Sequence, residues 1–165
     1  MKETVWEGNY LTAVKEGHWE YAERKGGVTA VVIVAIDDGH LLLVEQQRIP
    51  AGRRCLELPA GLVGDEDGQE TLAAAATREL EEETGWRPAH VEELGSYYAS
   101  PGMTSESFTI VRATGLTRVG GGGGVGSEDI TVHRVPLAEV PVLVDRKRRE
   151  GLGIDAKLLL FLAIV

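Results

Sequence analysis

The chain has 165 residues, 43% of them hydrophobic, and its 26 acidic and 17 basic side chains give a formal net charge of −9. That length suits one domain, residues 1–165, with its own core, and the composition excludes a disordered chain. The negative balance argues against nucleic-acid binding, which needs clustered basic residues. No apolar run approaches the about 18 residues of a membrane span, no secretory leader is recognisable, and the single cysteine cannot form an internal disulfide. We therefore expect a cytoplasmic domain with no membrane partner.

The first third of the chain reads as strands. Residues 10–14 and 19–24 flank a turn at 15–18 and so predict an N-terminal antiparallel hairpin. Residues 28–36 form a continuous apolar, β-branched run, which is typical of a central strand buried on both faces. Further strands are predicted at residues 41–49 and 55–58.

The clearest helix covers residues 72–84, with Thr71 as a suitable N-cap and Gly85 as a suitable stop. Residues 120–126, the glycine segment, contain six glycines and predict a mobile hairpin loop or an insertion. Strands with helices between and after them indicate an α/β (α+β) fold, a mixed sheet sandwiched between helices. The remaining predicted strands are residues 91–99, 108–117 and 130–135, and the remaining helices are 137–150 and 155–164.

Much of the acidic surplus falls within residues 65–83, and its spacing is unusual. At about 100° per residue, Glu79 and Glu83 share a helix face, with Glu82 beside them. Like charges at such spacings destabilise an isolated helix by roughly 0.2–0.5 kcal/mol per pair, and a hard cation such as Mg²⁺ removes that repulsion. Arg78 is placed to hold one carboxylate. A solvated acidic face is the alternative. The apolar stripe expected beside these carboxylates consists of Ala73, Ala76 and Leu80.

The segment over residues 64–86 resembles the Nudix box, G-x5-E-x7-R-E-U-x-E-E-x-G-U, in which U is usually aliphatic. Every fixed position is met, although the last apolar position is aromatic. In relatives the box glycine lies in the Pro-Ala-Gly turn itself, whereas here that turn, residues 59–61, precedes Gly64, so the loop into the helix is expected to be longer. The matching residues are Gly64, Glu70, Arg78, Glu79, Leu80, Glu82, Glu83, Gly85 and Trp86.

Other segments are similar to the ADP-ribose pyrophosphatase branch of that family, namely residues 19–21, 45–48, 56–61, 100–106 and 155–157. The resemblance implies the Nudix fold, with residues 1–25 as a dimerisation hairpin, and a homodimer that exchanges its N-terminal strands. It also implies a pyrophosphohydrolase that depends on Mg²⁺, with Mn²⁺ as a substitute. The expected reaction cleaves the diphosphate of ADP-ribose, or of a related nucleoside diphosphate sugar, into a nucleoside monophosphate and a sugar phosphate.

The same resemblance assigns roles to individual residues. The metal ligands would be the carboxylates of Glu79, Glu83 and Glu82 and the backbone carbonyl of Ala60. Glu106, in the Ser-Pro-Gly loop, would act as the base or orient the attacking water, and the catalytic set also includes Glu82 and Arg78.

Candidates for substrate binding lie outside the box. Arg48 ends a strand, where a guanidinium can clamp a diphosphate in bidentate fashion. Trp19 and Tyr21 share one face of their strand and can stack on an adenine, while Glu20 faces the other way. A surface role for Arg48 and a packing role for Trp19 remain equally compatible with the sequence. The full set of substrate-binding candidates is Arg48, Trp19, Glu20, Arg54, Gly61, Leu62 and Gly102.

Two alternatives concern the function. The substrate could be another nucleotide, such as FAD, GDP-mannose or a dinucleoside polyphosphate. A non-catalytic, nucleotide-sensing Nudix domain is the rival from a different class. Such domains usually lose box glutamates, and this chain retains them.

Overall fold

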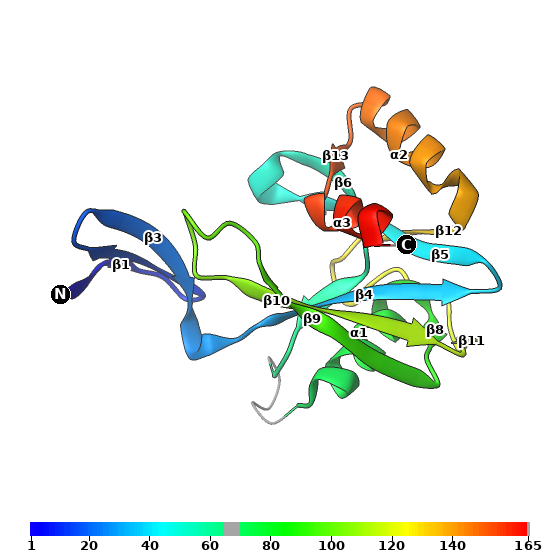
Figure 1. Cartoon of the computed structure of the whole chain (residues 1–165), viewed down its shortest axis with the longest axis horizontal. Helices are drawn as coiled ribbons and strands as arrows, with labels where there is room; N and C mark the ends of the chain where they lie inside the picture. The colour runs from blue at the N-terminus through cyan, green and yellow to red at the C-terminus, as the bar shows by residue number, and fades with distance from the viewer. Residues whose placement is uncertain (65–69, 165) are drawn as a thin grey trace.

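The computed structural model describes residues 1–64 and 70–164, so Asp65, Glu66 and Asp67 of the acidic stretch lie outside the described residues. A large mixed sheet carries helices on both faces, which confirms the predicted α/β (α+β) class (Figure 1). Its strands are β4 (Ala30–Asp37), β5 (His40–Arg48), β6 (Arg53–Glu57), β7 (Ala60–Leu62), β9 (His90–Tyr98), β10 (Ser107–Thr114), β12 (Thr131–Pro136) and β13 (Gly153–Ile154). They follow the order β13-β6-β5-β4-β10-β9, with β12 also paired to β5 and β7 to β4.

Strand β4 forms the centre of this sheet, parallel to β10 and antiparallel to β5 and β7. Val32 and Val34 belong to one core cluster, whereas Val31, Ile33 and Ala35 belong to the cluster on the opposite face. All five side chains are buried. A strand covered on both faces has no polar alternation, which explains the continuous apolar run in the sequence.

The helices divide between these two faces. Helix α1 (Leu72–Thr84) packs on one face, and α2 (Val140–Arg149) and α3 (Ala156–Ile164) pack on the other. The expected apolar stripe of α1 was wrong at Ala73, which is exposed; Ala75 is buried instead, beside Ala76 and Leu80. Glu83 and Thr84 at the end of the helix are buried as well, so the face of α1 that packs on the sheet lies on the side away from Ala73. Within the described part of the chain, no helix has the length and apolarity needed to cross a bilayer.

A separate three-stranded antiparallel sheet forms the N-terminus, far from α2 and α3 (Figure 1). It comprises β1 (Lys2–Glu7), β2 (Leu11–Glu16) and β3 (Trp19–Arg24). The β2–β3 hairpin was predicted, but β1 was not. The loop between β9 and β10 ties this sheet to the body, because Ala22 N–H donates to Met103 O at 2.9 Å and Ser105 N–H donates to Ala22 O at 3.1 Å.

The glycine segment, predicted to be a mobile hairpin loop or an insertion, packs against the end of α1. The backbone N–H groups of Gly123 and Gly124 donate to the carbonyls of Glu83 and Glu82, each at 2.9 Å. These bonds satisfy carbonyls that the last turn of a helix leaves free. A Cβ on Gly122 would lie 2.4 Å from the backbone of Thr84, so glycine permits this close approach. Just outside the contact, two short strands pair, β8 (Trp86–Arg87) and β11 (Thr117–Arg118).

Substituting Gly85 tests this packing. Gly85 ends α1 at φ +77°, and a Cβ there would lie 2.4 Å from Gly120 O. Gly52 provides a matched control, since its φ is +65° but a Cβ would meet nothing within 4 Å. Left-handed strain alone costs roughly 1–2 kcal/mol. We expect Gly52→Ala to lower the free energy of unfolding in urea by about that amount and Gly85→Ala to lower it by roughly twice as much or more. Equal losses would contradict close packing of the glycine segment.

Candidate active site

The site begins where β7 passes α1. Because β7 pairs with β4, Ala60 and Gly61 lie against the carboxylate face of the helix. A Cβ on Gly61 would fall 1.9 Å from Glu79 Cδ, so only glycine leaves room for that carboxylate. Ala60 N–H donates to Glu83 Oε2 at 3.1 Å. The structure therefore brings together three of the predicted ligand residues, Glu79, Glu83 and Ala60.

Glu83 is a buried carboxylate, only 6% exposed. Burial raises its pKa to about 8, and the nearby Glu79 charge adds to the rise, while the Ala60 N–H and Arg48 oppose it. The pKa of Glu79 is also raised, first by burial, although its hydrogen bond from Arg78 works against the increase. Ionised carboxylates in such surroundings are unfavourable unless a cation compensates them. The pair is thus prepared for a positive ligand.

Arg78 holds three carboxylates of the box in place, those of Glu70, Glu79 and Glu82. Its Nε and Nη2 atoms donate to both oxygens of Glu70, at 3.0 and 3.1 Å. Its Nη1 donates to Glu79 at 2.8 Å and to Glu82 at 3.3 Å, and Nη2 also donates to the carbonyl of Leu62 at 3.2 Å. The expected contact between Arg78 and a metal-site carboxylate is present, and the same guanidinium also fixes β7 relative to α1.

Glu128 is an acidic residue of this site that the sequence reasoning missed. It follows the glycine segment, in which Gly123 and Gly124 donate to the carbonyls of Glu83 and Glu82, and its charge is a minor cause of the raised pKa of Glu79 and of Glu83. Its Oε2 accepts a hydrogen bond from Val125 N–H at 2.9 Å, within the loop that packs on the end of α1. Nothing in the spacing of the box points to it. The only signal in the sequence is an acid that follows the glycine segment and precedes a strand.

The donor set suits a hard divalent cation. Among residues 1–64 and 70–164, no three His, Cys, Asp or Glu side chains converge closely enough to hold a metal ion by themselves. Mg²⁺ is usually bound by one or two carboxylates, with water and substrate phosphates completing its shell. Glu79, Glu83 and the carbonyl of Ala60 provide such a partial set. Burial raises the pKa of both carboxylates, and a cation bound there would favour their ionised form.

Glu106 lies at the same end of the sheet, immediately before β10. The register aligns Phe108 with Ala30 and Ala30 with Leu62, so the start of β10 and the end of β7 flank the start of β4. Glu106 Oε1 accepts a hydrogen bond from Arg24 Nη2 at 2.8 Å. Sequence reasoning missed Arg24, because only the contact between β3 and the β9–β10 loop reveals it. Gly102, another predicted site residue, lies exposed in that loop.

Arg48 is the last residue of β5 and bonds to the neighbouring strand β6. Its Nε and Nη2 donate to the two oxygens of Glu57 at 2.8 and 2.5 Å. That bond to Glu57, together with the charges of Glu83 and Asp155, raises the pKa of Arg48. Glu57 is 4% exposed, so a buried carboxylate orients a partly exposed guanidinium. Glu57 was not predicted, since its role depends on the pairing of β5 with β6.

Trp19 and Glu20, two of the predicted substrate-binding residues, lie on the N-terminal sheet of the same chain and not beside the α1 carboxylates. Trp19 lies on the N-terminal sheet, 54% exposed, with its ring centroid 5.5 Å from that of His18. Glu20 lies beside it on β3 and forms an exposed ion pair with Lys15 at 3.8 Å. Both are on the sheet at the far end of the molecule (Figure 1).

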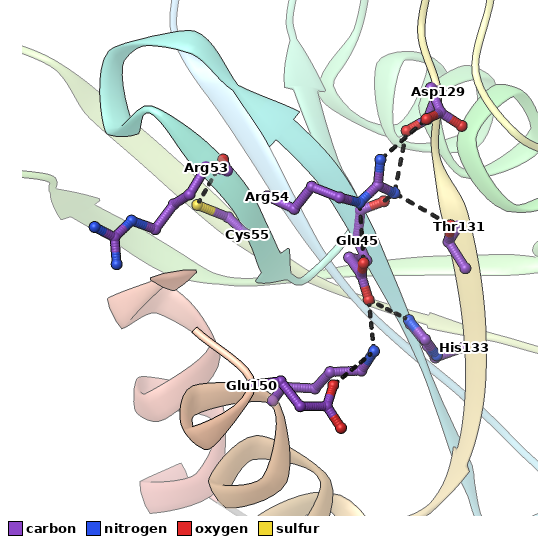
Figure 2. A network of polar contacts seen from close by, with 9 residues as sticks. Glu45, Arg53, Arg54, Cys55, Asp129, Thr131, His133 and Glu150 are labelled. Atoms are coloured by element: carbon purple, nitrogen blue, oxygen red, sulfur yellow. Dashed lines mark hydrogen bonds and ion pairs between the residues drawn. The ribbon is translucent and has the colours of Figure 1, made fainter. Parts of the chain in front are cut away.

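Arg54 takes part in a polar network centred on Glu45 (Figure 2). Arg54 Nε donates to Glu45 Oε1 at 2.9 Å, and Lys147 Nζ donates to Glu45 Oε2 at 2.8 Å. His133 Nε2 lies 3.2 Å from the same oxygen. Burial raises the pKa of Glu45, but the hydrogen bonds from Lys147, Arg54 and His133 outweigh it and bring the pKa to about 2. Arg54 thus contacts protein acceptors on β5 and around the start of β12.

The raised pKa of Glu83 predicts a pH-dependent stability. A carboxylate whose folded pKa, about 8, exceeds its ordinary value of 4.5 stabilises the fold at low pH, and that contribution is lost as the pH rises through 8. In chelator, we expect wild type to lose stability relative to Glu83→Gln between about pH 5 and about pH 9, as measured by urea unfolding. A constant difference between the two proteins across this range would show that Glu83 is ionised throughout.

Comparison with known proteins agrees with this geometry. A NUDIX domain family model matches residues 26–159. The ADP-ribose pyrophosphatase of Mycobacterium tuberculosis is 42% identical over 112 residues, covering 67% of this chain and 53% of that protein. The ADP-ribose pyrophosphatase of Saccharomyces cerevisiae is 36% identical over 107 residues, covering 59% and 45%.

A crystal structure of an ADP compounds hydrolase superposes with a TM-score of 0.71 at 27% identity, covering 88% of this chain and 80% of that one. The chain spans about half the length of the curated relatives it matches. Since the family model covers the whole large sheet and the box glutamates meet β7 beside it, the chain belongs to the Nudix family.

Proposed function

We propose that this Nudix protein is a Mg²⁺-dependent pyrophosphohydrolase that cleaves the diphosphate of ADP-ribose or a related nucleoside diphosphate sugar. The products are a nucleoside monophosphate and a sugar phosphate, and Mn²⁺ substitutes for Mg²⁺. The observation that carries the proposal is the meeting of Glu79 and Glu83 with Ala60, where both carboxylates have raised pKa values. Similarity to ADP-ribose pyrophosphatases supports the substrate class.

Each residue around the helix has a part in this chemistry. Glu79, Glu83 and the Ala60 carbonyl would hold the cation, with Glu82 sharing it. A bound divalent cation neutralises diphosphate charge and lowers the pKa of an attacking water. Arg78 keeps the carboxylates of Glu79 and Glu82 oriented. Arg48, already aligned by its partner Glu57, would donate to the diphosphate oxygens.

The N-terminal sheet supports the proposed homodimer. Every residue of β1 is exposed, including Trp6 at 59% and Val5 at 61%, and Trp19 on β3 is exposed as well. Large apolar side chains gathered on one small sheet mark an interaction surface. In the dimer, exchanged N-terminal strands would bring Trp19 and Glu20 to the partner's nucleotide, where Gly61, Leu62 and Gly102 form the near wall. The proposal includes a cytoplasmic location and no nucleic-acid or membrane partner.

An ADP-ribose hydrolysis assay tests the function directly. Wild type should release AMP with Mg²⁺ and lose activity in chelator. Glu83→Gln should lower kcat by roughly two to three orders of magnitude, because losing a charged metal ligand removes several kcal/mol of transition-state stabilisation.

Glu81→Gln is the matched control. Glu81 lies on the same helix but pairs with Arg87, outside the site, so its replacement should leave kcat nearly unchanged. Nucleotide binding without turnover by wild type would favour a sensing domain. Faster turnover of FAD, GDP-mannose or a dinucleoside polyphosphate in the same assay would replace ADP-ribose as the substrate.

A pair of variants distinguishes the roles of Glu106 and Glu128. Glu106 pairs with Arg24, whereas Glu128 follows the segment that bonds to the end of α1, and its charge acts on Glu79 and Glu83. We expect Glu106→Gln to slow kcat while Mn²⁺ affinity, measured by electron paramagnetic resonance titration, stays nearly unchanged. Glu128→Gln should weaken Mn²⁺ binding because it removes a negative charge that acts on Glu79 and Glu83. If Glu106→Gln abolishes Mn²⁺ binding instead, Glu106 is a ligand and the base lies elsewhere.

A further inference from the structure

Glu128 reaches the site on a segment that needs external anchors. Glycine loses more conformational freedom on folding than any other residue, so a run of glycines holds a side chain in place only if other contacts fix the run. One anchor is the end of α1, where Gly123 and Gly124 donate to helix carbonyls. The segment also closes on itself, because Ile130 N–H donates to Gly123 O at 3.2 Å. C-terminal to Glu128 in the sequence, the anchor is Arg54.

Arg54 connects β6 to the residues that follow Glu128. Its Nη1 donates to Asp129 Oδ2 at 3.0 Å, and its Nη2 donates to Thr131 Oγ1 at 3.1 Å and to Asp129 O at 3.4 Å. Toward the sheet, Nε and Nη2 donate to the carboxylate and the carbonyl of Glu45, at 2.9 and 2.8 Å. Figure 2 shows the guanidinium lying between Glu45 and Asp129. Each of its nitrogens therefore already donates to a protein acceptor.

The guanidinium is itself held firmly. Glu45 is only 9% exposed and is fixed from the other side by Lys147 and His133, which come from α2 and β12. Because a planar guanidinium has five donors in a rigid fork, it can serve acceptors on two sides at once, which an ammonium cannot do with the same geometry. The network thus links a buried carboxylate of the central sheet to the loop at the site.

We propose that Arg54 is a positioning residue of the Nudix site: through Asp129 and Thr131 it fixes the segment that carries Glu128 and that Gly123 and Gly124 join to the end of α1 at Glu83 and Glu82. The inference rests on the proposed function for its catalytic consequence, though not for the tether itself. It gives Arg54 a different role from the direct substrate contact that the sequence led us to expect, since each of its guanidinium nitrogens already donates to a protein acceptor.

Amide hydrogen exchange on the metal-free protein tests the tether without substrate. In Arg54→Ala, exchange of the Gly123, Gly124 and Ile130 amides should rise roughly tenfold, while amides of β4 keep their protection. Asp129 is exposed, and exposed ion pairs are weak, so Asp129→Asn should produce a smaller rise of about two- to fivefold. Unchanged protection in both variants would overturn the proposal, and Asp129→Asn remains decisive if Arg54→Ala fails to fold.

His133→Ala is the matched control, because His133 also contacts Glu45 but does not reach Asp129. It should leave the three amides at wild-type exchange. An equal rise in His133→Ala would mean that the network around Glu45 as a whole, rather than Arg54, holds the segment, and the proposal would fail.

Steady-state kinetics test the consequence for the reaction. Arg54→Lys should lower kcat roughly tenfold with little change in KM, because small displacements of a catalytic group are costly. Adding Asp129→Asn should cause little further loss, as expected for two members of one tether. A raised KM at unchanged kcat would make Arg54 a substrate contact, and fully additive losses would separate it from Asp129. If wild type does not turn over ADP-ribose, the proposed function fails, while the exchange result still decides the tether.

Discussion

The burial of the Glu83 carboxylate between α1 and β7 is the constraint on which the site depends. An ionised carboxylate in apolar surroundings is unfavourable. Here the Glu83 carboxylate accepts a hydrogen bond from the Ala60 N–H. Among the described residues, no cationic side chain lies within hydrogen-bonding distance of it. Gly61 adds to the crowding by letting Glu79 approach the turn. The protein therefore maintains a local conflict at the point where a positive ligand would relieve it. Such conflicts are expected at functional sites, where stability and activity oppose each other.

The neighbouring side chains follow one arrangement, in which a glutamate orients an arginine. Glu70 holds Arg78, Glu57 holds Arg48 and Glu45 holds Arg54, each through at least one hydrogen bond of 3.0 Å or less. Two of these pairs join the adjacent strands β5 and β6 in opposite senses. Arg48 lies on β5 and its partner Glu57 on β6, whereas Arg54 lies on β6 and its partner Glu45 on β5. A fixed guanidinium loses little entropy when it binds an anion or a loop, so each pair prepares its arginine for a defined partner.

The sequence predicted those features of the molecule that depend on residues close together in the chain. The run of apolar residues in β4, the capping of α1 and the spacing of Glu79, Glu82 and Glu83 all follow from periodicity and turn chemistry. Arg24, Glu57 and Glu128 could not be found in this way, because each owes its position to a strand or loop distant in sequence. The same limit explains the error at Ala73, since the exposed and buried faces of α1 were set by what packs against it. It also applies to the glycine segment, whose composition does not predict its hydrogen bonds to the end of α1.

The contact between β3 and the loop before β10 has a thermodynamic consequence. Arg24 ends β3 and binds Glu106, and Ala22 exchanges backbone hydrogen bonds with that loop. A movement of the N-terminal sheet therefore changes the surroundings of Glu106, and a ligand that displaces Glu106 acts on the sheet. Such coupling is reciprocal: the free energy by which assembly through the sheet alters ligand affinity equals the free energy by which the ligand alters assembly. If a partner binds this sheet and a ligand occupies the site, and both engage the Arg24–Glu106 ion pair, the two equilibria are linked.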